Sequence, residues 1–232
     1  MLKFETHEPF KFSVIDNYLE KSKISNAIDD IANISIWNDP NYGFKERLLK
    51  QEKDKYTKHE NYNIDYEPTH NRFVADKSQL GPNIQNVLKH FESPEVLQKF
   101  KLLANVDDLF FDKDLRGGGL QKSGNGAFLK VHIDNNWNPR TESYPILNVI
   151  LFMSDWCEEY GGSLELWTQT HCFKKILPIK NRLIIRENSD LSYHGFPTPI
   201  QCPENVFRYA LVMFYHTKKM IPENKRLSAV WI

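Results

Sequence analysis

The chain has 232 residues, of which 30 are Lys or Arg and 30 are Asp or Glu, so its formal net charge is zero. This balance argues against the basic surface of a nucleic-acid-binding protein and against binding to an anionic membrane. No segment approaches the ~20 apolar residues of a membrane-spanning helix. The N-terminus lacks the apolar stretch of a signal peptide, and three cysteines favour reduced thiols over a disulfide framework. We therefore expect a cytoplasmic protein, with the oligomeric state left open.

The first hundred residues carry apolar side chains at helical spacing. This spacing predicts one helix over residues 22–34 and another around Leu48. Pro82 and Pro94 each precede a further helical stripe, and proline is common in the first turn of a helix. Residues 53–80 are polar and contain several tyrosines, so they are interpreted as a long loop, and such loops often carry function.

After about residue 105 the pattern changes to short apolar runs separated by Gly, Pro, Asn and Asp. The predicted strands cover residues 127–133, 146–153, 163–167, 173–178, 182–186 and 207–216. Many short strands without intervening helices are typical of an antiparallel sandwich or barrel. We expect a mainly β fold in which residues 1–104 form a mostly helical N-terminal extension that packs on one sheet. Residues 105–232 would be the β core of the same continuous domain.

A candidate metal site begins with His132 and Asp134 at the end of a predicted strand. Residues two apart in a strand share a face, so both side chains would point the same way at its rim. A His-x-Asp pair alone is common by chance, but His194 offers a third ligand. Two histidines and one carboxylate suit non-haem Fe(II) and leave coordination positions open, as in oxygenases. The alternative for His194 is a structural histidine in a proline-rich turn.

Arg208 is the one charged residue in the apolar run from Phe207 to Tyr215. It shares a strand face with Ala210, Val212 and Phe214, so its guanidinium is expected to point inward. A buried charge is costly unless it is paired, and the planar fork of arginine suits a carboxylate. The partner is either a protein Asp or Glu, or a ligand carboxylate such as the distal one of 2-oxoglutarate.

Over about residues 80–218 the chain resembles the 2-oxoglutarate- and Fe(II)-dependent dioxygenases of the prolyl-4-hydroxylase-like type. The segments that carry the resemblance are Asp114–Leu120, the strand ending in His132-Ile-Asp134, Asp155–Trp167, Pro178–Ile185, Ser192–Pro197, and Cys202-Pro203 before Arg208. The resemblance implies a double-stranded β-helix, or jelly roll. It implies His132, Asp134 and His194 as iron ligands, and Arg208 as the residue that binds the distal carboxylate of 2-oxoglutarate. It also implies O2 as a reactant and ascorbate as a supporting reductant.

The activity implied is a hydroxylase that couples substrate oxidation to decarboxylation of 2-oxoglutarate to succinate and CO2. Asn148 is a further candidate for the cosubstrate pocket. The chain departs from many relatives by having Tyr144-Pro145-Ile146 ahead of Leu147-Asn148, where a basic residue is common, and by having Arg208 where many prolyl hydroxylases have Lys. The sequence therefore does not decide whether the substrate is a peptidyl proline, a free amino acid, or a sugar or other metabolite. Two alternatives remain: a cupin-type metalloenzyme of another reaction class and a non-catalytic jelly-roll binding module.

Overall fold

The computed structural model describes residues 2–5, 8–40, 68–220 and 222–232. The helix expected around Leu48, and residues 53–67 of the expected loop, lie outside these ranges. The described residues form a mainly β protein with three helices, α1 (Lys21–Ile31), α4 (Pro82–Glu92) and α5 (Pro94–Ala104). Two short 3₁₀ turns, η1 (Lys77–Gln79) and η2 (Glu158–Tyr160), connect other elements.

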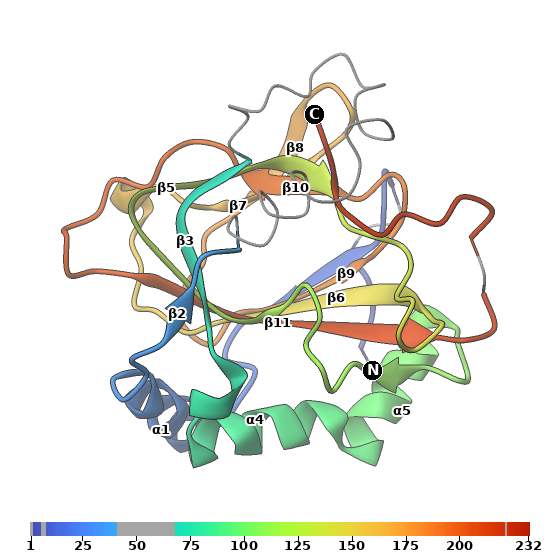
Figure 1. The fold of residues 1–232 in the computed structure, drawn as a ribbon, viewed down its shortest axis with the longest axis horizontal. Helices are drawn as coiled ribbons and strands as arrows, with labels where there is room; N and C mark the ends of the chain where they lie inside the picture. The colour runs from blue at the N-terminus through green and yellow to red at the C-terminus, as the bar shows by residue number, and fades with distance from the viewer. Residues whose placement is uncertain (1, 6–7, 41–67, 221) are drawn as a thin grey trace.

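The strands form a curled antiparallel sheet, and its two parts face each other as the layers of a double-stranded β-helix (Figure 1). The larger part contains β1 (Phe12–Ile15), β9 (Leu183–Glu187), β6 (Tyr144–Phe152), β11 (Arg208–Thr217) and the beginning of β5 (Gly119–Ile133). The smaller part contains the end of β5, followed by β10 (Tyr193–Phe196), β7 (Leu164–Trp167) and β8 (Cys172–Ile176). Four further strands pair with these, namely β2 (Trp37–Asn38), β3 (Thr69–Ala75), β4 (Phe110–Phe111) and β12 (Val230–Trp231).

The three helices lie together on the outer side of the larger part, under β11, β6 and β9 (Figure 1). Both α4 and α5 begin with a proline. Proline is favourable there because it has no N–H, and an N–H in the first turn has no acceptor within the helix. Ser93 caps α5 because its side chain accepts a hydrogen bond from the N–H of Val96. Asn105 ends α5 in the left-handed conformation. These signals are local, and the predicted helices around residues 22–34, 84–91 and 96–103 are confirmed.

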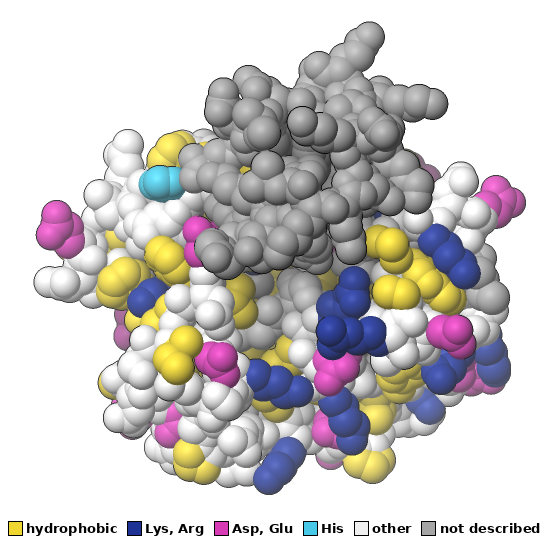
Figure 2. All heavy atoms as spheres, in the orientation of Figure 1, with side chains coloured by type: hydrophobic (Ala, Val, Ile, Leu, Met, Phe, Trp, Pro, Cys, Tyr) yellow, Lys and Arg dark blue, Asp and Glu magenta, His cyan; other side chains and the backbone are white. Residues whose placement is uncertain are grey.

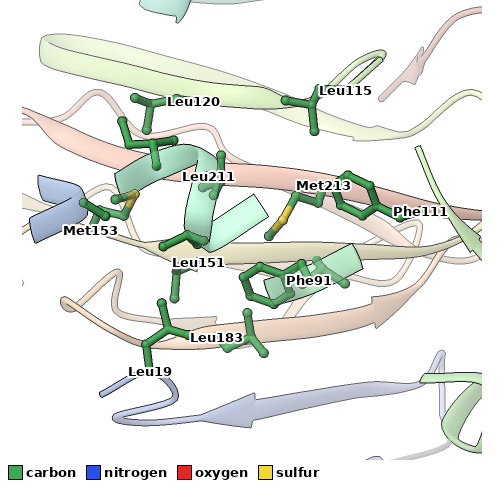
Figure 3. Packing of buried hydrophobic residues seen from close by; sticks show 14 of the residues in the cluster. Leu19, Phe91, Phe111, Leu115, Leu120, Leu151, Met153, Leu183, Leu211 and Met213 are labelled. Carbon is green, nitrogen blue, oxygen red and sulfur yellow. The ribbon is translucent and has the colours of Figure 1, made fainter. Parts of the chain in front are cut away.

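The core is divided between two layers by strand alternation. On β11, Leu211 and Met213 face the helices, whereas Val212 and Phe214 face the interior of the β-helix. Figure 3 shows the outer layer, where Phe91 of α4 lies among side chains from β6, β9 and β11. The same alternation applies to β6 and β9, so Ile150 and Phe152 of β6 and Ile184 of β9 point inward. A polar side chain on the inward face of these strands therefore lies in the interior of the β-helix.

Several strands differ from the expectation. Residues 69–75, part of the expected loop, form β3, which pairs with β5, and residues 12–15 form β1, which pairs with β9. Both segments lack a clear apolar alternation, and the strands with which they pair lie far away in sequence, so only tertiary pairing makes them strands. β5 begins at Gly119 rather than at residue 127, because the Gly124-Asn125-Gly126 segment bends the strand without ending it.

The described surface is mixed in charge. Figure 2 shows Lys, Arg, Asp and Glu side chains interspersed over the described part of this face, which agrees with the formal net charge of zero. Cys157, Cys172 and Cys202 are free thiols. None of the helices in the described ranges combines the length and the apolarity that crossing a membrane requires.

Candidate metal and cosubstrate site

The structure brings His132, Asp134 and His194 together at one end of the β-helix. His132 lies near the end of β5, Asp134 follows the last residue of that strand, and His194 lies on the neighbouring β10. β10 pairs with β5 so that His194 is directly opposite His132. One ligand atom from each of the three residues lies within 4.8 Å of the others, a spacing that could hold a metal ion. The Nε2 atoms of His132 and His194 lie 3.5 and 3.7 Å from the Asp134 carboxylate.

Gly195 allows this pairing because β10 and β5 approach each other closely beside His194. A Cβ on Gly195 would lie 2.7 Å from the carbonyl oxygen of Leu129 and 2.9 Å from that of Lys130. Its backbone is extended, so the glycine is required here for the close approach of the two strands. His194 is therefore a strand residue, and the alternative of a turn histidine is wrong.

We expect Gly195→Ala to push β10 away from β5 and to destabilise the fold by about 1–3 kcal/mol, the usual range for overpacking a tight contact. The same shift would separate His194 from His132 and weaken metal binding. Chemical denaturation and a Mn²⁺ titration of the folded variant measure the two effects. Unchanged stability together with unchanged metal affinity would contradict this account.

The hydrogen bonds of the two histidines select the ring form that a metal needs. Nδ1 of His132 lies 2.9 Å from the carbonyl oxygen of Lys130, and Nδ1 of His194 lies 3.0 Å from that of Ser192. Because a carbonyl oxygen can only accept, each Nδ1 carries the proton. In the neutral ring this leaves a lone pair on Nε2, the nitrogen that faces Asp134 in both residues.

Charges in the site also favour metal binding. Burial lowers the pKa of His194 well below its ordinary value, and the nearby positive charge of Arg186 lowers it further, so the ring is neutral. Burial by itself would raise the pKa of Asp134, but the pKa is held well below its usual range, with the permanently charged Arg186 donating a hydrogen bond to the carboxylate. A neutral imidazole and an ionised carboxylate are the protonation states in which these groups coordinate a metal.

Arg186, which the sequence analysis missed, lies next to the three residues. Its side chain is fully buried on β9, and its Nη2 donates to the Asp134 carboxylate and lies 2.8 Å from His194 Nε2. The lone pair of Nε2 can serve either this N–H or a metal ion, so metal binding requires Arg186 to leave His194 while keeping Asp134. The signal for Arg186 was present in the sequence, because it ends the apolar run Leu183–Ile185 at a position that alternation turns inward.

Arg208 points into the interior at the start of β11, on the face that also carries Ala210, Val212 and Phe214. Only 5% of its surface is exposed. Its guanidinium carbon lies 4.9 Å from the centre of the Phe152 ring and 4.6 Å from that of Phe196, so the cation is in contact with two aromatic rings. Within the described ranges, no carboxylate lies at ion-pair distance from Arg208, and its Nε has no hydrogen-bond partner.

Burial, reinforced by the positive charge of Arg72, lowers the pKa of Arg208 to about 9. The guanidinium therefore stays charged at neutral pH and can bind an anion.

Asn148, the other predicted pocket residue, lies opposite Arg186 on β6 and is buried with an unpartnered Oδ1. Trp231 of β12 was not predicted either, and its ring centre lies 4.5 Å from that of His132.

Comparisons with known proteins agree with this geometry. The profile of the 2OG-Fe(II) oxygenase superfamily matches residues 118–216, a range that contains His132, Asp134, His194 and Arg208. The fold is similar to that of a prolyl hydroxylase from Trichoplax adhaerens, solved in complex with a peptide fragment of the hypoxia inducible factor oxygen degradation domain. That match has 16% identity and a TM-score of 0.56, and it covers 90% of this chain and 84% of the other.

Two other solved structures are also similar in fold. A prolyl-4-hydroxylase from Pseudomonas putida has 12% identity and a TM-score of 0.53, with 89% of this chain and 92% of the other covered. HygX from Streptomyces hygroscopicus, with nickel, 2-oxoglutarate and hygromycin B bound, has 11% identity and a TM-score of 0.54, with 91% and 84% covered. No match was found among the curated proteins compared.

The donor set fits Fe(II), since two imidazole nitrogens and one ionised carboxylate lie within 4.8 Å of one another, and two histidines with one carboxylate are typical ligands of non-haem Fe(II). The family match favours an oxygenase over the cupin-type enzyme and over the binding module. The profile match spans the region that holds all four residues, and together with the gathered His132, Asp134 and His194 this similarity to the 2OG-Fe(II) oxygenase superfamily indicates an oxygenase that depends on Fe(II) and 2-oxoglutarate.

Proposed function

We propose that this oxygenase is a hydroxylase in which His132, Asp134 and His194 hold Fe(II) and Arg208 binds the distal carboxylate of 2-oxoglutarate. The observation that carries the proposal is Arg208 itself. It is a buried cation that lies against the Phe152 and Phe196 rings, and among the described residues no carboxylate pairs with it. A buried charge of this kind requires an anionic partner, and a dicarboxylate cosubstrate supplies one.

The bound iron and cosubstrate supply the oxidising chemistry, with O2 consumed and 2-oxoglutarate released as succinate and CO2. The residues of the chain hold and orient these reactants. Lys130 and Ser192 accept hydrogen bonds from the two Nδ1–H groups and so fix the histidine rings. Arg208 sets the direction of the cosubstrate, and the apolar side chains around it, including Val212 and Phe214, exclude water.

The substrate is proposed to be a peptide or a small molecule. Among the similar folds, the Trichoplax adhaerens enzyme is in complex with a peptide and HygX has hygromycin B bound, so both classes are candidates here. The chain is further proposed to act as one continuous domain in the cytoplasm. Hydrogen bonding of β1 and β3 into the same sheet as residues 105–232 supports the first point, and the three free thiols support the second.

The decisive experiment measures succinate release by the Fe(II)-loaded protein under air. Unproductive turnover of 2-oxoglutarate should give a low rate that depends on Fe(II) and O2. A panel of proline-containing peptides, free amino acids and sugars is then screened for compounds that raise this rate and gain one oxygen atom by mass spectrometry. Failure to bind 2-oxoglutarate in calorimetry with Mn²⁺ would refute the proposed cosubstrate site.

β3 is expected to become more protected when the site fills, because it forms the edge beside β5 and its Arg72 is half-buried. Amide exchange of residues 69–75 should slow on adding Mn²⁺ and 2-oxoglutarate, and slow further with a true substrate. Helix α4 lies on the outer side of the sheet and is the internal control. Equal exchange in β3 before and after all additions would remove this segment from the site.

A further inference from the structure

A second arginine lies in the same row of the sheet as Arg208. β5 pairs with β3 on one side and with β11 on the other, and Ser123 of β5 is the register partner of both Arg72 and Arg208. Register partners on neighbouring strands point to the same face of a sheet. The two arginines therefore flank one small, buried serine, and both side chains belong to one face.

That face is the interior of the β-helix. The adjacent row, Phe73, Lys122 and Tyr209, points the other way, and the Lys122 ammonium lies 4.4 Å from the centre of the Trp37 ring on the outside. Two residues before Ser123, Gln121 again points inward, and its Oε1 accepts a hydrogen bond of 3.2 Å from Arg72 Nε. This bond directs the Arg72 side chain along the inner face and leaves its two terminal amino groups available.

Neither guanidinium has a carboxylate at ion-pair distance within the described part of the chain, and the charge of Arg72 acts on Arg208. Burial, with the charge of Arg72, lowers the pKa of Arg208 to about 9, and burial lowers that of Arg72 to about 10. Asp134 is the carboxylate whose charge acts on Arg72, but Asp134 is already hydrogen-bonded to Arg186. Two facing cations repel unless an anion lies between them.

We propose that Arg72 is a second ligand of the 2-oxoglutarate distal carboxylate, which is held between the Arg72 and Arg208 guanidiniums over Ser123. The inference rests on the proposed function, because it requires Arg208 to bind this carboxylate. A carboxylate has two oxygens and about four acceptor positions, enough for both arginines. Arg208 lies against the Phe152 and Phe196 rings and extends from β11, whereas Arg72 extends from β3 on the other side of Ser123.

Calorimetry of the Mn²⁺-loaded protein tests this with two probes, 2-oxoglutarate and 2-oxopentanoate, which keeps the chain length and the chelating end but lacks the distal carboxylate. Arg72→Gln should weaken 2-oxoglutarate binding by about 10–100-fold, the range for loss of a hydrogen bond to a charged group. Its affinity for 2-oxopentanoate should stay that of the parent. Arg72→Lys should recover part of the loss, and added salt should narrow the difference between parent and Arg72→Gln.

Lys122→Gln is the matched control, since this substitution removes a cation from the outer face of the same group of strands. The Lys122→Gln variant should bind 2-oxoglutarate with the affinity of the parent. In the double variant Arg72→Gln with Arg208→Lys, the loss of 2-oxoglutarate binding free energy should differ from the sum of the losses in the two single variants, because both side chains contact one carboxylate. If Arg72→Gln binds 2-oxoglutarate as tightly as the parent, the inference is wrong while the proposed function stands. If the parent prefers 2-oxoglutarate no more than 2-oxopentanoate, the proposed function fails first.

Discussion

His194→Ala is expected to lower the affinity of the protein for Fe²⁺ and Mn²⁺ by roughly 100-fold or more and to abolish succinate release. Loss of even an outer partner of a metal ligand costs about 10–100-fold, and His194 supplies one of three donor atoms gathered within 4.8 Å. His132→Ala should have a similar effect, because its Nε2 is held toward the same point by the hydrogen bond to Lys130. Anaerobic metal titration of the parent should give one site per chain.

The two histidines are better test positions than Asp134. Removing the Asp134 carboxylate would also leave the fully buried Arg186 without its anionic partner, which costs about 3–5 kcal/mol for a buried pair and endangers folding. His171→Ala is the matched control, since His171 is an exposed histidine between β7 and β8 and lies outside the site. Parent-like metal affinity in both His132→Ala and His194→Ala would refute the assignment of the ligands.

Arg208→Ala is expected to weaken 2-oxoglutarate binding by about 2–5 kcal/mol, the cost of removing one partner of a buried charge pair. Arg208→Lys should keep part of the affinity, because the charge survives while the two-pronged geometry is lost. The metal site should remain intact in both variants, since Arg208 makes no contact with the three proposed ligands. Calorimetry with Mn²⁺ in place of Fe²⁺ separates cosubstrate binding from turnover.

Arg182→Ala is the control for Arg208. Arg182 is an arginine immediately before β9, but it pairs with Asp16 on the outside, so its loss should leave 2-oxoglutarate binding unchanged. If folded Arg208→Ala bound 2-oxoglutarate like the parent, the cosubstrate would have to be anchored elsewhere, and the proposed role of Arg208 would be lost.

The sequence predicted those features whose physical cause is local. Pro82 and Pro94 mark helix starts because proline lacks an N–H, and the helical spacing around them is complete within each segment. Strand alternation predicted that Arg208 shares a face with Val212 and Phe214, and this face is the interior. The His-x-Asp spacing predicted that His132 and Asp134 meet at a strand end, since two residues apart is one repeat of the strand.

Only the tertiary structure decided the features that depend on distant pairing. β3 is a strand because it forms hydrogen bonds with β5, and the sequence of residues 69–75 has no local pattern that predicts a strand. The placement of Arg72 beside Arg208 follows from both pairing with Ser123, a register that no local pattern contains. The contact of Arg186 with Asp134 likewise requires the two layers of the β-helix to close on each other. A sequence thus determines which side chains share a face of one element, while the hydrogen-bond register between elements determines which of those faces meet.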